Sequence, residues 1–180
     1  DCLTGKGIEI AIIDTGIDYT HPDLGGCFGS GCKVIAGYDF VNKDNNPMDD
    51  NGHGTHVAGI AAGKGILNGV APDAKLYSYK VLDILGNGWI SDIILGIDRA
   101  IDPNQDGDFS DHVDIISMSL GGSCSLGYNE WCGPDDPISI AVDSAANMGV
   151  IVVISAGNSG PDGQTINTPG TARKAITVGA

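Results

Sequence analysis

Several short runs of the chain consist almost entirely of apolar residues, and they limit the possible folds more than any other feature. "GIEIAIID" (7–14) and "GVIVVISAG" (149–157) are the clearest of these runs. A strand with one face in water alternates apolar and polar residues, whereas a strand buried on both faces is apolar throughout. The two runs therefore predict strands inside a sheet that is covered on both faces.

Helical patterns lie between the expected strands. "WISDIILGIDRAI" (89–101) repeats isoleucine at the spacing of one helix face, and "PISIAVDSAANM" (137–148) opens with proline, which the first turn of a helix tolerates. The isoleucines of the first helix are Ile90, Ile93, Ile94, Ile97 and Ile101. Further strands are expected at 33–40, 75–82, 113–120 and 175–180. This alternation predicts a three-layer α/β domain, with a mostly parallel sheet and helices on both faces.

Polar residues follow three of these strands. Asp14 ends one strand, Ser119 ends another, and Asn158 follows a third. Functional groups of such folds gather beyond the carboxyl ends of the strands, so we expect these side chains at one edge of the sheet.

The charge of the chain excludes some partners. Nine basic residues against 23 acidic ones give a formal charge of −14, which argues against binding nucleic acid or an anionic membrane. Acidic composition is also common simply for solubility, so it identifies no partner. No apolar run of the sequence approaches the roughly 18–20 residues that span a bilayer.

Five cysteines are present, and four of them form two close pairs. Cys27 with Cys32 and Cys124 with Cys132 lack the spacing of a zinc site, so two short-loop disulfides are the simplest interpretation. Cys2 is left over. Disulfides indicate an oxidising setting, hence a secreted or cell-surface protein.

Two histidines stand among glycines in "NGHGTHVAG" (51–59). A metalloprotease helix would read HExxH, but Gly54 and Thr55 separate His53 from His56, and the phosphate-loop pattern GxxxxGK[ST] is absent. A general base held rigidly at the start of a small-residue helix fits better. Taken alone, the segment also fits two ordinary histidines.

The "DTG" at 14–16 is ambiguous by itself. It could be half of an aspartic protease dyad, but that site needs two such loops and only one occurs. An aspartate that simply caps a loop is the plainer alternative. A dinucleotide-binding module is excluded, because the first strand lacks the GxGxxG that such a module requires.

Taken together, the motifs resemble those of the subtilisin-like serine proteases, the subtilases. The matching segments are collinear along essentially the whole chain. They are "IIDTGID" (12–18), "HPDL" (21–24), "GHGTHVAGI" (52–60), "GVAPDAKLYSYKVL" (69–82), "SMSLGG" (117–122) and "SAGNSGP" (155–161).

The resemblance implies a role for each matched residue. Asp14 would orient His53, His53 would be the general base, and Asn158 would donate to the oxyanion, while His56 would be structural. A polypeptide substrate would pair as an added strand between two backbone edges. Those edges are Gly86 with Gly88, and Ser119 with Leu120 and Gly121; Ala156 and Gly157 would line the pocket wall.

The nucleophile motif of the family, a Gly-Thr-Ser-Met-Ala-type helix start, is missing. The serines at 117, 119, 155 and 159 belong to other matched motifs. We therefore expect residues 1–180 to be part of a catalytic domain, truncated before the nucleophile helix and inactive without the remainder of that domain. The alternative is a non-catalytic fragment or pseudoprotease that binds only peptide or calcium.

The segment "DPNQDGDFSD" (102–111) predicts a structural calcium ion. Its D-x-N-x-D-G order resembles the front of an EF-hand loop, with Asp111 replacing the missing acid at the twelfth position. A solvated acidic loop remains the alternative. The candidate ligands are Asp102, Asn104, Asp106, Asp108 and Asp111. A weaker site is expected at Asp39, Asp44 and Asn46, because thermitase-like relatives bind calcium before the histidine motif.

Overall fold

The computed structural model describes residues 3–122, 132–163 and 165–179. Its centre is a six-stranded sheet in the order β2-β3-β1-β4-β5-β6, in which every strand pairing is parallel. The strands are β1 (Glu9–Asp14), β2 (Val34–Asp39), β3 (Lys75–Lys80), β4 (Ile115–Met118), β5 (Ile151–Ser155) and β6 (Ile176–Val178). The predicted α/β class is confirmed.

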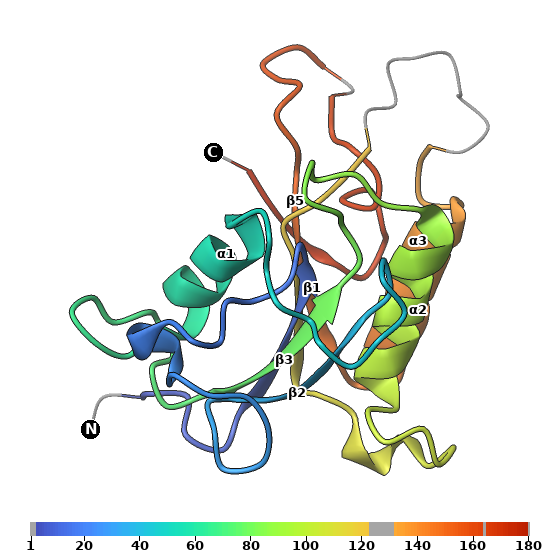
Figure 1. Cartoon of the computed structure of the whole chain (residues 1–180). Coiled ribbons are helices and arrows are strands. Elements are labelled where there is room, and N and C mark those ends of the chain that lie inside the picture. The colour runs from blue at the N-terminus through green and yellow to red at the C-terminus, as the bar shows by residue number, and fades with distance from the viewer. Residues whose placement is uncertain (1–2, 123–131, 164, 180) are drawn as a thin grey trace.

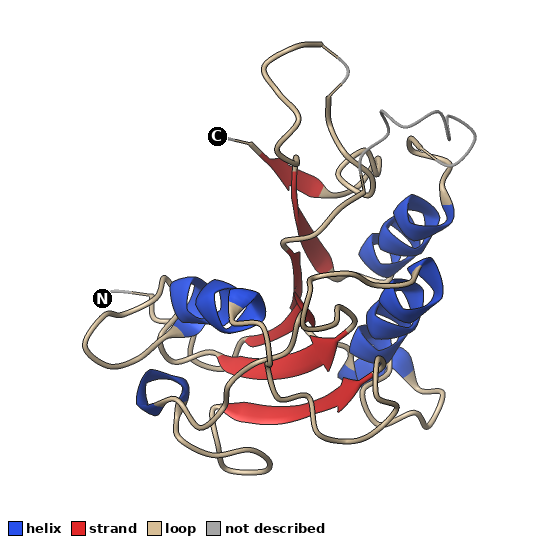
Figure 2. Ribbon diagram, turned by 45° about the horizontal axis from the view of Figure 1, so that its top comes forward, coloured by secondary structure: helices blue, strands red, loops and turns tan. Residues whose placement is uncertain are grey.

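Helices cover both faces of the sheet. The helix α1 (His53–Ala62) lies on one face, and α2 (Ile90–Ile101) and α3 (Pro137–Asn147) lie side by side on the other (Figure 1). Two short 3-10 helices, η1 (Pro22–Leu24) and η2 (Phe109–Asp111), lie in the connections. Figure 2 shows the same three layers with the loops gathered around the strand ends.

The apolar run of β1 is explained by burial on both faces of the sheet, as predicted. The same expectation is wrong for β5, where Ile151 is 50% exposed. In β1, Ile10 and Ile12 pack toward α1, while Ala11 and Ile13 pack toward α2 and α3. Each of the four side chains is at most 5% exposed. Full burial of such a side chain contributes roughly 1.5–3 kcal/mol, so a polar residue at any of these positions would be costly.

The predicted buried face of α2 is confirmed except at the first turn of the helix. Ile93, Ile97 and Ile101 are buried as predicted, but Ile90 is 47% exposed. It occupies the first turn of the helix and lines a surface cleft instead of the core. At α3, Asp136 caps the helix by accepting the backbone N–H groups of Ile138 and Ser139 at 2.9 and 3.0 Å.

Three neighbouring strands each end in a buried charged residue. The register pairs Asp14 of β1 with Lys80 of β3, and Lys80 with Asp39 of β2. Paired residues of parallel strands point to the same face, which here is the face that α1 covers. All three are at most 2% exposed. This charged row, Asp39-Lys80-Asp14, lies at the carboxyl edge of the sheet.

The disulfide Cys27–Cys32 is present, with the two Cα atoms 5.6 Å apart. The second expected disulfide involves Cys124, which, like Cys2, lies outside the described residues. Among the described helices, none has both the length and the apolar character to cross a bilayer.

Candidate active site

Glycines on either side of His53 place that histidine at the edge of the sheet. Gly52 caps α1 with φ +103°, a left-handed conformation that side chains rarely adopt. A Cβ atom at Gly54 would lie 2.2 Å from the Gly16 carbonyl oxygen. The small residues of the motif therefore let α1 approach the end of β1 closely.

His53 is hydrogen-bonded to the aspartate that ends β1. The His53 Nδ1 atom lies 2.7 Å from Asp14 Oδ1, within the expected range. Because an ionised carboxylate only accepts hydrogen bonds, Nδ1 is the donor in this contact, and in the neutral imidazole the lone pair is then on Nε2. The His53 side chain is 46% exposed, whereas Asp14 is fully buried. This arrangement gives a base that is fixed on one side and open to the cleft on the other.

Burial dominates the electrostatics of Asp14. Burial raises the pKa of Asp14 above its ordinary value, although hydrogen bonds from His53 and the Thr15 backbone act in the opposite direction. Its Oδ1 accepts both of these bonds, whereas Oδ2 is buried without a hydrogen-bond partner in the described part of the chain. The hydrogen bond from the His53 imidazole is therefore one of the few contacts that stabilise the ionised form of Asp14.

A second carboxylate, Asp49, joins the two segments that carry this pair. Its Oδ1 accepts from the Thr15 hydroxyl at 2.9 Å, and its Oδ2 accepts from the Thr55 hydroxyl at 2.5 Å and the Thr55 N–H at 2.9 Å. Thr15 in turn accepts the N–H of Gly54 at 2.9 Å. The loop after β1 and the first turn of α1 are therefore held together.

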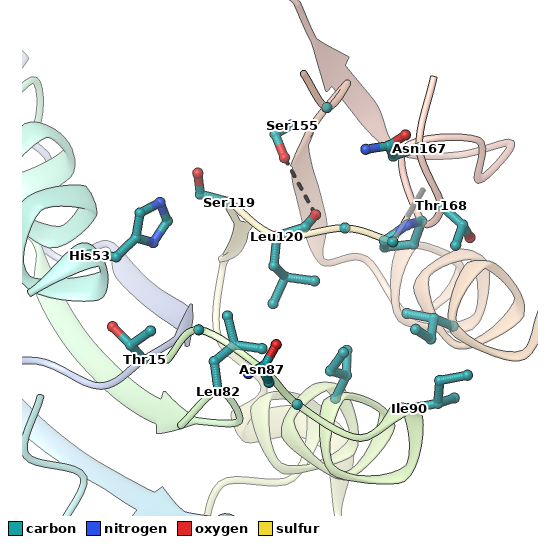
Figure 3. Close-up of a pocket in the computed structure, with 18 of the residues that line it drawn as sticks. Thr15, His53, Leu82, Asn87, Ile90, Ser119, Leu120, Ser155, Asn167 and Thr168 are labelled. Atoms are coloured by element: carbon teal, nitrogen blue, oxygen red, sulfur yellow. Dashed lines mark hydrogen bonds between the residues drawn. The ribbon is translucent and has the colours of Figure 1, made fainter. Parts of the chain in front are cut away.

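His53 opens into a cleft of about 720 Å³ (Figure 3). In Figure 3, His53 stands at one end of the cleft and Asn167 with Thr168 at the other. The expected residues that line it are Gly86, Gly88, Ser119, Leu120, Gly121, Gly157 and Asn158. Ala156 is not among the lining residues; its carbonyl accepts the N–H of Asn167, which does line the cleft, at 2.9 Å.

Each of the two backbone edges has one glycine, Gly88 or Gly121, at which there is no room for a side chain. A Cβ atom at Gly88 would lie 2.4 Å from the Val81 carbonyl oxygen, and one at Gly121 would lie 2.9 Å from the Thr168 carbonyl oxygen. Between these edges the cleft exposes main chain, which an extended peptide can pair with.

Sequence reasoning missed part of the cleft. Apolar lining comes from Leu82, Ile90 and Ile93, and the far end comes from Asn167 and Thr168. The strand-end rule could have found Leu82, because it follows β3. Asn167 precedes β6, so no strand-end signal marks it. His56, expected to be structural, is exposed on α1.

The acidic loop folds around its own side-chain oxygens. The Asp102 carboxylate accepts the N–H groups of Asp106 and Gly107 at 3.2 and 3.0 Å, and Asn104 Oδ1 accepts the Asp106 N–H at 2.9 Å. Asp108 instead caps η2 through the Ser110 N–H at 3.0 Å.

The structure does not gather the full expected ligand set. Across residues 3–122, 132–163 and 165–179, no group of three or more acidic, histidine or cysteine side chains is placed to hold a metal. Asp111 is not brought into such a group with Asp102 and Asp106, and its Oδ1 is buried without a hydrogen-bond partner in the described structure.

The second expected calcium site is also dispersed. Asp39 accepts the backbone and side-chain N–H groups of Asn42, each at 2.8 Å. Asp44 accepts the N–H of Asn46 at 2.8 Å, and Asn46 Oδ1 accepts the Tyr19 hydroxyl at 2.5 Å. These contacts build a turn before α1.

Comparison with known proteins identifies one family. The model of the subtilase family matches residues 5–180. Serine protease AprX of Bacillus subtilis is 46% identical over 183 residues, which cover 99% of this chain and 39% of AprX. Minor extracellular protease Vpr of the same organism is 46% identical over 186 residues, covering 98% of this chain and 21% of Vpr.

Solved structures give the same result. Sphericase superposes with a TM-score of 0.77 at 39% identity, covering 97% of this chain and 54% of sphericase. A cold-adapted subtilisin-like serine proteinase also gives 0.77, at 32% identity, covering 98% of this chain and 56% of that protein. The chain therefore spans about half or less of each of these relatives. With its family match, its identities and its shared fold, the chain belongs to the subtilase family.

Proposed function

We propose that this chain is part of a secreted serine endopeptidase that hydrolyses peptide bonds with an Asp-His-Ser triad. The observation that carries the proposal is the 2.7 Å contact between buried Asp14 and half-exposed His53 at the edge of a cleft. The proposed serine belongs to a segment of the same protein outside residues 1–180, so residues 1–180 form part of one catalytic domain and are inactive alone.

The proposed chemistry begins with proton transfer to His53. Nε2 accepts the proton of the serine hydroxyl as its Oγ attacks the scissile carbonyl carbon, and Asp14 stabilises the imidazolium that forms. Asn158 donates its amide N–H to the oxyanion of the tetrahedral intermediate. His53 then gives the proton to the leaving amine, and water hydrolyses the acyl-enzyme by the same steps.

α1 covers only part of its face of the sheet, which supports the proposal that a further segment of the same protein packs beside it. Ile10, Ile115 and Ile151 form one row across β1, β4 and β5 on the α1 face. Ile10 is 5% exposed, whereas Ile151 is 50% exposed, and Ile176 and Val178 of β6 are more than half exposed on the same face. An amphipathic helix from the rest of the catalytic domain would bury this apolar area beside α1.

The cleft supports a polypeptide substrate in an extended conformation. Its main chain would pair with the edges at Gly86 to Gly88 and at Ser119 to Gly121. Apolar lining from Leu82, Ile90 and Ile93 favours apolar substrate side chains. The names of AprX and Vpr, which describe proteases, agree with such a substrate.

We further propose a structural calcium ion at the acidic loop. Asp102, Asn104 and Asp106 offer the oxygen ligands that calcium prefers, and their contacts with the loop backbone hold these side chains on one turn. When bound, the ion would neutralise carboxylates that otherwise repel each other. Asp108 and Asp111 would contribute only after rearrangement of the loop.

Secretion of the protein is supported by the Cys27–Cys32 disulfide and by the extracellular relative Vpr.

Labelling with a fluorophosphonate serine probe tests the proposed function in the whole protein. We expect labelling of the wild type, and its loss in His53→Ala, because the serine is then not activated. His56→Ala is the matched control on the same helix and should label normally, since His56 is exposed and outside the cleft. A wild-type protein that folds but neither labels nor cleaves peptides would instead be a pseudoprotease.

A further inference from the structure

Lys80 is a buried lysine that the proposed chemistry does not use. It is the last residue of β3 and is 1% exposed. Removing an ammonium ion from water costs several kcal/mol unless its donors are all satisfied. Replacing a buried ion pair by apolar residues is often neutral or stabilising, so stability alone does not account for a lysine here.

The ammonium group of Lys80 makes three hydrogen bonds, which use all its donors. Nζ lies 2.8 Å from the Thr15 carbonyl oxygen, 3.0 Å from the Leu82 carbonyl oxygen and 2.6 Å from Asp50 Oδ1. These acceptors come from three segments of the chain. Three donors with three acceptors fix the ammonium in one position.

Each acceptor belongs to a segment that builds the candidate active site. Thr15 directly follows Asp14, Asp50 lies three residues before His53, and Leu82 leads into the cleft edge at 86–88. Thr15, Leu82 and His53 all line the cleft, as Figure 3 shows. Lys80 itself is not among the lining residues, so its effect on the site passes through these neighbours.

The charged row places Lys80 between two buried carboxylates. Its register partners are Asp14 on one side and Asp39 on the other, both on the same face of the sheet. A cation between two anions is the favourable order, and it opposes the repulsion that two neighbouring carboxylates would feel. Asp50, which is not part of the sheet, provides a further negative charge at 2.6 Å from Lys80 Nζ, and its side chain is 45% exposed.

We propose that Lys80 is a positioning residue for the Asp14–His53 pair. Through Thr15 it fixes the end of β1, and through Asp50 it fixes the loop that leads into α1, so the carboxylate and the imidazole keep their mutual position. The inference rests on the proposed protease function for its kinetic readout. It also has a readout that needs no activity.

Lys80→Met in the whole protein is the first test, because methionine is an unbranched side chain only one atom shorter than lysine and has neither its charge nor its donors. We expect kcat to fall about 10- to 100-fold, the order of loss that a misplacement of about 1 Å causes. KM should rise less than kcat falls. The His53 Nδ1 proton, observed by NMR, should lose its downfield hydrogen-bonded resonance.

Lys64→Met is the matched control. Lys64 also donates to a carboxylate at 2.6 Å, that of Asp73, but its side chain is 64% exposed and the pair lies outside the cleft. Its loss should leave kcat within about twofold, as expected for a surface ion pair.

Asp50→Ala tests the proposal if Lys80→Met does not fold. Asp50 is half exposed, so its replacement should disturb folding less. We expect a smaller fall in kcat and the same change of the His53 resonance, with Asp50→Asn restoring both in part. Folded variants at Lys80 or Asp50 with wild-type kcat and an unchanged resonance would overturn the proposal. If the wild type itself lacks activity, the protease function fails, and the resonance alone still decides the role of Lys80.

Discussion

The carboxylate of Asp49 stabilises the candidate site by serving several donors at once. Besides Thr15 and Thr55, it accepts the N–H groups of Asn51 and Gly52, each at 2.9 Å. Burial by itself would raise the pKa of Asp49, but the hydrogen bonds from Gly52, Thr55 and Asn51 together lower it below the ordinary value. The ionised form is therefore the one that the fold requires.

Asp49→Asn should destabilise the protein at neutral pH but not at low pH. A depressed pKa in the folded state means that Asp49 stabilises the fold above its unfolded pKa and loses that contribution as pH falls through its folded pKa. Urea unfolding between pH 7 and pH 3 should show the two proteins converging as the pH falls. Asp135→Asn, at an 81% exposed carboxylate, is the control and should change little. A constant difference across the range would contradict this account.

At the scale of the elements, the apolar runs predicted where β1 and β5 lie. The expected burial on both faces holds for β1, but β5 is buried only on the face of α2 and α3, and Ile151 on its other face is 50% exposed. The exact ends were not predictable, since the strands expected at 33–40 and 113–120 are Val34–Asp39 and Ile115–Met118 in the structure. The N–H of Val113, for example, bonds the Ala100 carbonyl of α2 and not a strand. Asp14 and His53 could be identified because their motifs are local in sequence. Lys80 and Asp49 could not, because a buried polar network depends on segments that meet only in the fold.

The packing of α1 on β1 can be tested at two glycines of the same helix. Gly54→Ala should destabilise the protein by about 1–3 kcal/mol, as overpacking does, because its Cβ would meet the Gly16 carbonyl oxygen. Gly59→Ala should instead stabilise it by roughly 0.5–1 kcal/mol, since nothing lies within 4 Å of its added Cβ. Denaturant titration measures both changes. Equal effects at the two positions would show that α1 does not approach β1 as described.

For the molecule as a whole, the formal charge of −14 means that a bound cation should stabilise the fold by reducing the repulsion between carboxylates. If calcium occupies the acidic loop, a chelator should lower Tm, because calcium at a hundredfold excess over Kd stabilises the fold by about 2.7 kcal/mol. Asp106→Asn in the whole protein should bind one calcium fewer by calorimetry and respond less to the chelator. Unchanged calcium uptake in that variant would favour the solvated acidic loop.

The strand order also governs how the protein can form. The central strand β1 pairs with β3 and β4, which begin only at Lys75 and Ile115. During synthesis this largely apolar strand therefore leaves the ribosome long before either partner exists. Such non-local pairing folds slowly and leaves unpaired strand edges open to aggregation. Asp14 and His53 thus meet in their final setting late in the life of the nascent chain, which delays assembly of the proposed proteolytic site until most of the sheet has been made.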